Sequence, residues 1–251
     1  MDRKVMQAVS LTALNYAVNA EGLQQSWTVL MFSFLVRLGF SALLRPGEIF
    51  NLLRGDLRFI DRGGAENCIV IAIRSPKTAS KGGRTQFALA HGSGLYAYGH
   101  WILQGLIDSD PLWPFSPATF RKVLDGCLRE LNCHEIGYTP GSLRPGGTTD
   151  RVLGGEEVSR LQWAGRWLAA ASMKAYVQEA VSHYAWTSIP VSAQNSIHQL
   201  ISQFGSFLTV PPSVPWQLVL VAWRTTAGSV QLRDKKFAQW RVRSLTSSVT
   251  A

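Results

Sequence analysis

The sequence predicts a mainly α-helical protein with one small antiparallel β-sheet, an α+β fold. A composition of 46% hydrophobic and 16% charged residues excludes a disordered or collagen-like chain and allows a sizeable core. Apolar residues recur at helical spacing through most of the first 183 residues. Two short apolar runs flank a loop rich in Pro, Ser and Gly, a pattern typical of a β-hairpin.

Helices are expected to open the chain. Residues 3–19 and 27–43 both show helical spacing, and Ser26 is a suitable N-cap for the second helix. Pro46 suits the first turn of a third helix, so Arg45 is expected at a junction between helices.

The hairpin and further helices come next. Residues 67–73 and 86–90 are predicted strands, with residues 74–84 as an exposed loop between them. Segments with helical spacing, separated by Pro and Gly, are then found at 92–107, 116–132, 146–154, 156–163 and 168–183.

After Trp186 the periodicity changes, and the pattern alone predicts no function for the remaining residues. Residues 191–208 fit one more helix, and residues 217–223 with 229–232 fit a hairpin. We therefore predict one domain over residues 1–185 and a C-terminal basic extension over 186–251.

The charge points to a polyanionic partner. The 251 residues hold 25 Lys and Arg against 16 Asp and Glu, a formal charge of +9. The extension 186–251 carries +5 of it, which leaves +4 for the first 185 residues. Most of the excess therefore lies outside the predicted domain.

Cysteine use and hydropathy predict a cytosolic or nuclear protein with no membrane partner. Three cysteines without a CxxC pair argue against a disulfide framework and against a standard zinc site. The apolar stretch 27–44 is interrupted by Arg37 and Gly39, and the stretch 214–223 is too short to span a bilayer. No secretory signal pattern begins the sequence.

Four short motifs hold the residues that could carry chemistry. They combine arginine, lysine and aromatic residues with Pro and Gly. In chain order they read Leu44-Arg45-Pro-Gly-Glu48-Ile, Ser75-Pro-Lys77-Thr, Gly141-Ser-Leu-Arg144-Pro-Gly-Gly, and Gly165-Arg166-Trp167 with Tyr176 nine residues after the Trp.

Each motif alone has a structural explanation. Arg45 can form an i, i+3 ion pair on a helix surface, worth a few tenths of a kcal/mol. Lys77 can keep a loop soluble, and Arg144 can bind a preceding carbonyl. Trp167 and Tyr176 can be core aromatics.

In this order and spacing, however, the motifs resemble those of the tyrosine recombinases, the phage integrase family. Arg45 lies in a segment that resembles the first arginine box, and Lys77 resembles the hairpin lysine. Arg144 falls where the His-x-x-Arg motif belongs, and Trp167 to Tyr176 matches the interval to the nucleophile. The resemblance spans about residues 26–183. It is nearest to eukaryotic mobile-element recombinases and implies a fold like their catalytic domain.

The resemblance implies DNA breakage and rejoining, and the chemistry suits the residue types. A phenol ionises only near pH 10, so a tyrosine nucleophile needs a cationic pocket or a base. Arg45 and Arg144 would bind the non-bridging phosphate oxygens. Tyr176 would form a 3′-phosphotyrosyl bond, and Lys77 would protonate the 5′-oxygen that leaves. The bond energy stays in that linkage, so no metal or cofactor is implied.

Trp167 completes the catalytic set, in which it would donate its indole N–H to a phosphate oxygen or buttress the pocket. Glu48, Gly141 and Arg166 hold supporting positions. Glu48, one helical turn after Arg45, would orient that arginine. Arg166 either adds a phosphate contact or is a solvated surface arginine, and the residues leave both open.

Two departures from the family pattern favour a second hypothesis, a catalytically impaired, DNA-binding remnant of a mobile-element recombinase. Gly141 stands where the family has histidine, and loss of such a group typically costs about 10²- to 10⁴-fold in rate. Only about two dozen residues precede the match, so the usual N-terminal core-binding domain is expected to be absent, most simply because the chain is truncated.

Double-stranded DNA is the expected partner, and the resemblance implies a homo-oligomer, a tetramer on DNA. A generic RNA- or membrane-surface binder would explain the charge but would leave the ordered motifs as coincidence. The sequence has no aromatic stacking motif or basic amphipathic repeat to support it.

Overall fold

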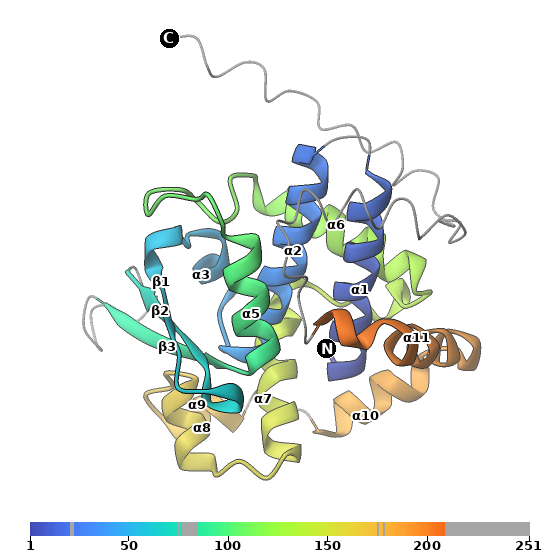
Figure 1. Ribbon diagram of the computed structural model, residues 1–251. Coiled ribbons are helices and arrows are strands. Elements are labelled where there is room, and N and C mark those ends of the chain that lie inside the picture. Colours follow the sequence, from blue (N-terminus) through green and yellow to red (C-terminus); the bar gives the residue numbers. More distant parts are fainter. Residues whose placement is uncertain (21–22, 75, 77–84, 175, 178, 209–251) are drawn as a thin grey trace.

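The computed structural model describes residues 1–20, 23–74, 76, 85–174, 176–177 and 179–208, and it shows a mainly helical α+β protein, as predicted (Figure 1). Its α-helices are α1 (Arg3–Asn19), α2 (Leu23–Ser41), α3 (Pro46–Phe50), α5 (Ser93–Ile102), α6 (Pro117–Glu130), α7 (Leu143–Leu153), α8 (Val158–Ala164), α9 (Ala170–Lys174), α10 (Glu179–Ser188) and α11 (Val191–Phe204). Short 3-10 turns are η1 (Arg54–Asp56), η2 (Gly64–Glu66), η3 (His134–Ile136), η4 (Pro140–Ser142) and η5 (Gly205–Leu208).

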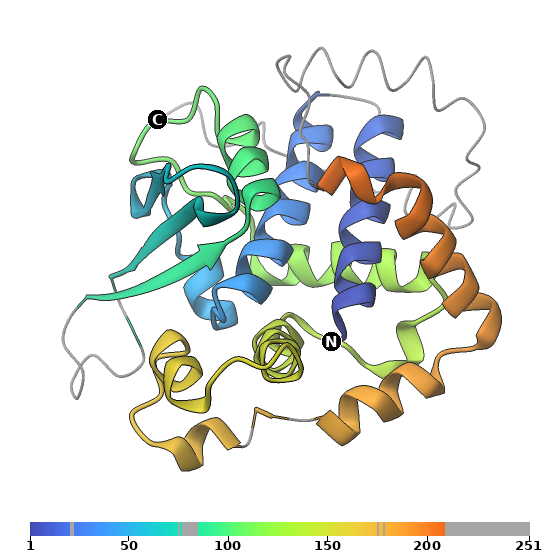
Figure 2. The same cartoon turned by 60° about the horizontal axis from the view of Figure 1, so that its bottom comes forward.

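The core is built around α2, whose side chains from 28 to 40 are nearly all buried. Helix α1 lies against it, and α5, α6 and α7 contact the pair from other sides (Figures 1 and 2). The predicted cap at Ser26 is wrong, because α2 begins at Leu23. Ser26 lies within the helix, where its buried hydroxyl donates to the carbonyl oxygen of Ala17 at 2.9 Å.

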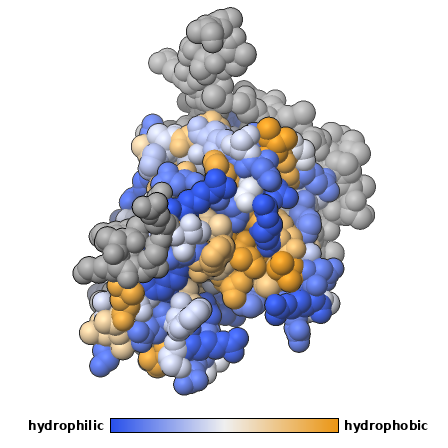
Figure 3. Space-filling model, turned by 90° about the vertical axis from the view of Figure 1, so that its left-hand side faces the viewer, coloured by the Kyte–Doolittle hydropathy of each residue, from blue (hydrophilic) through white to orange (hydrophobic). Residues whose placement is uncertain are grey.

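The sheet has three antiparallel strands in the order β1 (Leu57–Ile60), β2 (Cys68–Ile73) and β3 (Gln86–His91). The sequence predicted the pair β2–β3 but not β1. One face of the sheet packs on the core through residues such as Ile71 and Ala88. On the other face β3 exposes Phe87, which is 63% accessible, and Leu89. Figure 3 views the side of the molecule that carries the sheet and shows apolar groups there among hydrophilic ones.

Close backbone approaches fix α7 against the core. A Cβ atom at Gly147 would overlap the carbonyl oxygen of Phe40 in α2, so only glycine allows the two helices to approach this closely. The sequence predicted that this helix begins at residue 146. It begins at Leu143, because Pro145 lies in the first turn, where its missing N–H costs nothing.

The segment predicted as one helix over 168–183 is divided into α9 and α10, with Tyr176 between them. Helices α10 and α11 then run around the outside of α1 (Figures 1 and 2). Ala193 and Ile197 of α11 and Leu208 of η5 belong to the same buried cluster as α1 and α2. Residues 186–208 therefore pack on the main core, although they lie in the predicted extension. The hairpin predicted within 217–232 lies outside the described residues.

No helix in the described part of the chain is long and apolar enough to cross a membrane. Cys68, Cys127 and Cys133 are all buried free thiols, in agreement with the prediction that they form no disulfide. Within the same residues, no group of three or more His, Cys, Asp or Glu side chains is placed to hold a metal ion.

Candidate active site

Glu48 joins two arginines that are far apart in the sequence. Pro46 starts α3, and the Glu48 carboxylate accepts hydrogen bonds from the backbone N–H of Arg45 at 2.8 Å and from its Nη1 at 2.7 Å. One carboxylate oxygen also accepts from Nη2 of Arg166, again at 2.7 Å. The predicted Arg45–Glu48 pair therefore forms, and it has a third member that the sequence did not reveal.

Arg166 is held in the interior and is not a solvated surface arginine. Its side chain is only 6% accessible, and its backbone has φ 58°, in the left-handed region that side chains other than glycine seldom adopt. From this position after α8, the Arg166 side chain reaches Glu48 of α3. Burial lowers the pKa of the Arg166 guanidinium, and the neighbouring Glu48 carboxylate opposes that shift.

Arg144, at the start of α7, is more deeply buried, at 2% accessible. Its Nη1 donates to the carbonyl oxygen of Leu43 at 2.7 Å, and its Nη2 donates to the carbonyl oxygen of Gly165. It therefore ties the α2–α3 connection to the α8–α9 connection. Burial, and after it repulsion from Arg45 and Arg166, lowers its pKa to about 9, which leaves it charged at neutral pH.

Trp167 and Tyr176 cover the Arg144 guanidinium. The Cζ atom of Arg144 lies 4.3 Å from the centroid of the Trp167 ring and 5.4 Å from that of Tyr176, and the two rings are 5.3 Å apart. Tyr176 is half-buried, and its carbonyl oxygen accepts from the Thr149 hydroxyl of α7 at 3.3 Å. Cation–π contacts of this kind are worth about 0.5–2 kcal/mol.

The cluster has donors without acceptors. Among the described residues, Nε of Arg144, Nε of Arg166 and Nε1 of Trp167 are buried and make no hydrogen bond. An unsatisfied buried donor costs about 1–3 kcal/mol. Three arginines face a single glutamate here, so the cluster also carries a net charge of +2. An oxyanion would satisfy both the donors and the charge.

Six of the eight predicted site residues are thus brought together: Arg45, Glu48, Arg144, Arg166, Trp167 and Tyr176. Lys77 lies outside the described residues. Gly141 is in η4, exposed, with its backbone N–H bonded to Thr139 Oγ1 at 3.1 Å. No cluster atom lies within 4 Å of the position that a Cβ atom of residue 141 would occupy.

The structural explanations considered for single residues also apply. Arg144 does bind carbonyls, and Trp167 does pack in a small apolar cluster with Leu43, Leu161 and Met173. Those explanations do not account for the presence of several buried arginine side chains together in this one cluster. No sequence pattern indicated that the Leu43 carbonyl oxygen accepts from Arg144, because the two residues are 101 positions apart.

Comparison of the chain with models of protein families, with curated proteins and with solved structures finds no match. The α+β class therefore rests on the structure described above. No comparison supports a family for this chain, and the resemblance to the tyrosine recombinases is one of motif order and spacing alone.

Proposed function

We propose that this protein breaks and rejoins DNA strands through a 3′-phosphotyrosyl intermediate, with Tyr176 as the nucleophile. The observation that carries the proposal is the cluster itself: Arg144 and Trp167 lie against the one tyrosine that the motif order marks, and three buried N–H donors of the cluster are unused. Recombination or integration of DNA is the biological activity that such chemistry would serve.

In the proposed reaction Tyr176 gives its hydroxyl proton to solvent, and the phenolate oxygen attacks the scissile phosphorus. The new Tyr Oη–P bond forms as the P–O5′ bond breaks, and the 5′-oxygen takes a proton, supplied by Lys77. The charge that develops on the non-bridging oxygens is met by guanidinium groups, for which bidentate contacts are favourable. Rejoining is the reverse reaction, with a 5′-hydroxyl as nucleophile.

The accessibility of the three arginines determines the order in which a phosphate group from solution contacts them. The Arg45 side chain is 22% accessible, so a phosphate arriving from solution meets it before Arg144 or Arg166. The guanidinium of Arg144 is covered by the rings of Trp167 and Tyr176. A phosphodiester therefore contacts Arg144 only after one of these rings has moved.

A non-cleaving DNA-binding protein is the second candidate function, and Gly141 favours it. Glycine offers no acid, base or donor side chain at the position where the family has histidine. Among the described residues other than its two chain neighbours, only Thr139 places a side-chain atom, Oγ1, within 4 Å of its Cβ position. Such a protein would bind DNA with a steep dependence on salt, because release of counterions from phosphates dominates affinity. It would not cut the strand.

A nicked duplex that traps the covalent intermediate separates the two functions. The full chain should give an adduct that survives SDS, and Tyr176→Phe should give none. Tyr184→Phe is the matched control, since Tyr184 is an exposed tyrosine of α10 outside the cluster, and it should form as much adduct as the unmodified chain. DNA binding without adduct from any of the three proteins would reject cleavage and favour the second function.

A further inference from the structure

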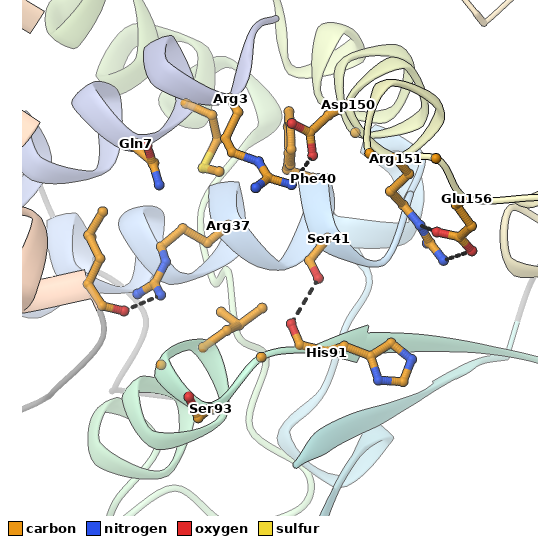
Figure 4. Close-up of a pocket in the computed structure, with 18 of the residues that line it drawn as sticks. Arg3, Gln7, Arg37, Phe40, Ser41, His91, Ser93, Asp150, Arg151 and Glu156 are labelled. Atoms are coloured by element: carbon orange, nitrogen blue, oxygen red, sulfur yellow. Dashed lines mark hydrogen bonds and ion pairs between the residues drawn. The ribbon is translucent and has the colours of Figure 1, made fainter. Parts of the chain in front are cut away.

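Four arginines, Arg3, Arg37, Arg151 and Arg160, line a cavity that shares no residue with the cluster that contains Tyr176. This cavity of about 760 Å³, open to the surface, lies between α1, α2, the start of α5 and the end of α7 (Figure 4). None of the six clustered residues lines it. Its volume is within the range of about 300–1,000 Å³ typical of sites for small molecules.

Arg37 of α2 is the buried cation of this cavity. The residue is 9% accessible, its Nη2 donates to the carbonyl oxygen of Leu208 at 2.5 Å, and its Nη1 has no hydrogen-bond partner among the described residues. Its Cζ atom lies 5.2 Å from the centroid of the Tyr98 ring. No described carboxylate forms an ion pair with it. A buried charge without a counter-charge is unfavourable, so Arg37 lacks an anion.

The start of α5 adds donors to the same cavity. Residues 92–95 line it, and Gly92, the N-cap, has φ 120° and no side-chain cap for the ten-residue helix. The first N–H groups of a helix have no partner within the helix, and the helix dipole favours negative charge there. A Cβ atom at Gly92 would meet nothing within 4 Å, so the backbone there is open to a ligand.

The remaining charged residues of the lining do not neutralise Arg37. Asp150 is paired with Arg3, and Glu156 accepts two hydrogen bonds from Arg151 and lies 3.8 Å from Arg160. The cavity therefore holds four arginines against two carboxylates. Burial, and after it the charges of Arg151 and Arg160, also lowers the pKa of His91, which lines the same space.

Apolar side chains complete the lining and limit the ligands that could fit. Met6, Phe40 and Leu95 face the same space, and its volume far exceeds that of a free phosphate ion. From this combination we infer that the cavity binds a small molecule with an anionic head group, a phosphate or a carboxylate, held by Arg37 and the N-terminus of α5, and with an uncharged apolar body. This site is separate from the proposed DNA-cleaving function.

The inference is tested on the full chain with three probes of one shape: phenyl phosphate, benzoate and neutral benzyl alcohol. At constant ionic strength, calorimetry should detect binding of at least one of the two anions and none of the alcohol. The stronger of the two anions identifies the head group. If neither anion binds, or if the alcohol binds equally well, the inference is wrong.

Variants assign the binding to this cavity. Arg37→Gln should weaken binding of the anion about tenfold or more, because it removes a charged hydrogen-bond donor. Arg37→Lys should weaken it less. Arg121→Gln, on the surface of α6, should leave it unchanged. Retention of full binding in Arg37→Gln would place the anion outside this cavity and overturn the inference.

Amide hydrogen exchange on the unmodified chain locates the bound anion without the need for any substitution. The bound anion should slow amide exchange at residues 93–95 and leave residues 166–176 unchanged. Slowing at 166–176 alone would contradict the assignment.

Discussion

At the scale of single residues, Glu48 holds the candidate active site together, because it is the one described carboxylate bonded to both Arg45 and Arg166. Glu48→Gln keeps the shape but removes the negative charge. Breaking a buried ion pair from one side typically costs about 3–5 kcal/mol, and we expect a loss of that order in the free energy of unfolding, measured by urea denaturation.

Glu135→Gln is the matched control for this change. Glu135 is exposed and lies 3.9 Å from His134, a pairing of little consequence for stability. Equal effects of the two substitutions would show that the network around Glu48 is not stabilising.

A close contact explains why glycine occupies the first position of the Gly165-Arg166-Trp167 motif. A Cβ atom at Gly165 would overlap the six-membered ring of Trp167, so Gly165→Ala should displace that ring and lower the free energy of unfolding by about 1–3 kcal/mol. Gly154→Ala, where the nearest atoms are 3.4 Å from the added methyl, should have a much smaller effect. Denaturation measures the loss of stability, and the difference in emission between each protein and its Trp167→Phe variant isolates the spectrum of Trp167 from those of the other eight tryptophans. An unchanged spectrum in Gly165→Ala would contradict this contact.

The sequence predicted which residues belong to the candidate site better than it predicted which residues they contact. The motif order marked Arg45, Arg144, Trp167 and Tyr176, and the structure brings these four together. Arg166 was left open, since a single arginine beside a tryptophan carries no sign of burial. Its ion pair to Glu48 joins residues 118 positions apart, and no local pattern encodes such a contact.

At the scale of elements, the turn between α7 and α8 depends on a paired carboxylate. Arg151 of α7 donates to Glu156 through Nε at 2.6 Å and through Nη2 at 2.7 Å. That hydrogen bonding lowers the pKa of Glu156. The stabilisation is therefore complete above the ordinary glutamate pKa of 4.5 and is lost as the pH falls through the lower, folded value.

Glu156→Gln should accordingly lower the free energy of unfolding at pH 7 by about 0.5–1 kcal/mol, the range for a partly exposed pair. Its difference from the unmodified chain should shrink as the pH falls below the ordinary glutamate pKa. Thermal denaturation at neutral pH and at a pH about one unit below that pKa measures this. A difference that grows on acidification would contradict the assignment.

Long elements were predictable from the sequence, and short ones were not. Residues 3–19 were predicted to be a helix and form α1 over the same range, because seventeen residues of consistent spacing outweigh local preferences. Strand β1 was missed because its four residues are too few to show alternation of apolar and polar side chains. Its extended structure depends on pairing with β2, which the local sequence does not show. The division of 168–183 was missed for a similar reason: it depends on where Tyr176 packs.

At the scale of the whole molecule, the predicted boundary at residue 185 matches neither the end of the packed core nor the start of the charged segment. Residues 186–208 hold no Lys, Arg, Asp or Glu and pack on the core through α11, whereas residues 209–251 carry the whole +5 of the predicted extension. A chain that ends at Leu208 should therefore keep the fold.

That shorter chain should bind DNA more weakly than the full chain, and the logarithm of its affinity should depend less steeply on the logarithm of salt concentration. Each lost phosphate contact lowers the slope by about 0.9. Fluorescence anisotropy over a salt series measures both quantities. Identical slopes would mean that residues 209–251 make no phosphate contacts.

The central claim is that Tyr176 attacks DNA, and mapping the covalent bond tests it most directly. After reaction of the full chain with the nicked duplex, nuclease and protease digestion and then mass spectrometry should find the nucleotide remnant on the peptide that contains Tyr176, attached to that tyrosine. A remnant on any other residue, or unmodified Tyr176 in a sample that contains the SDS-resistant adduct, would contradict the account.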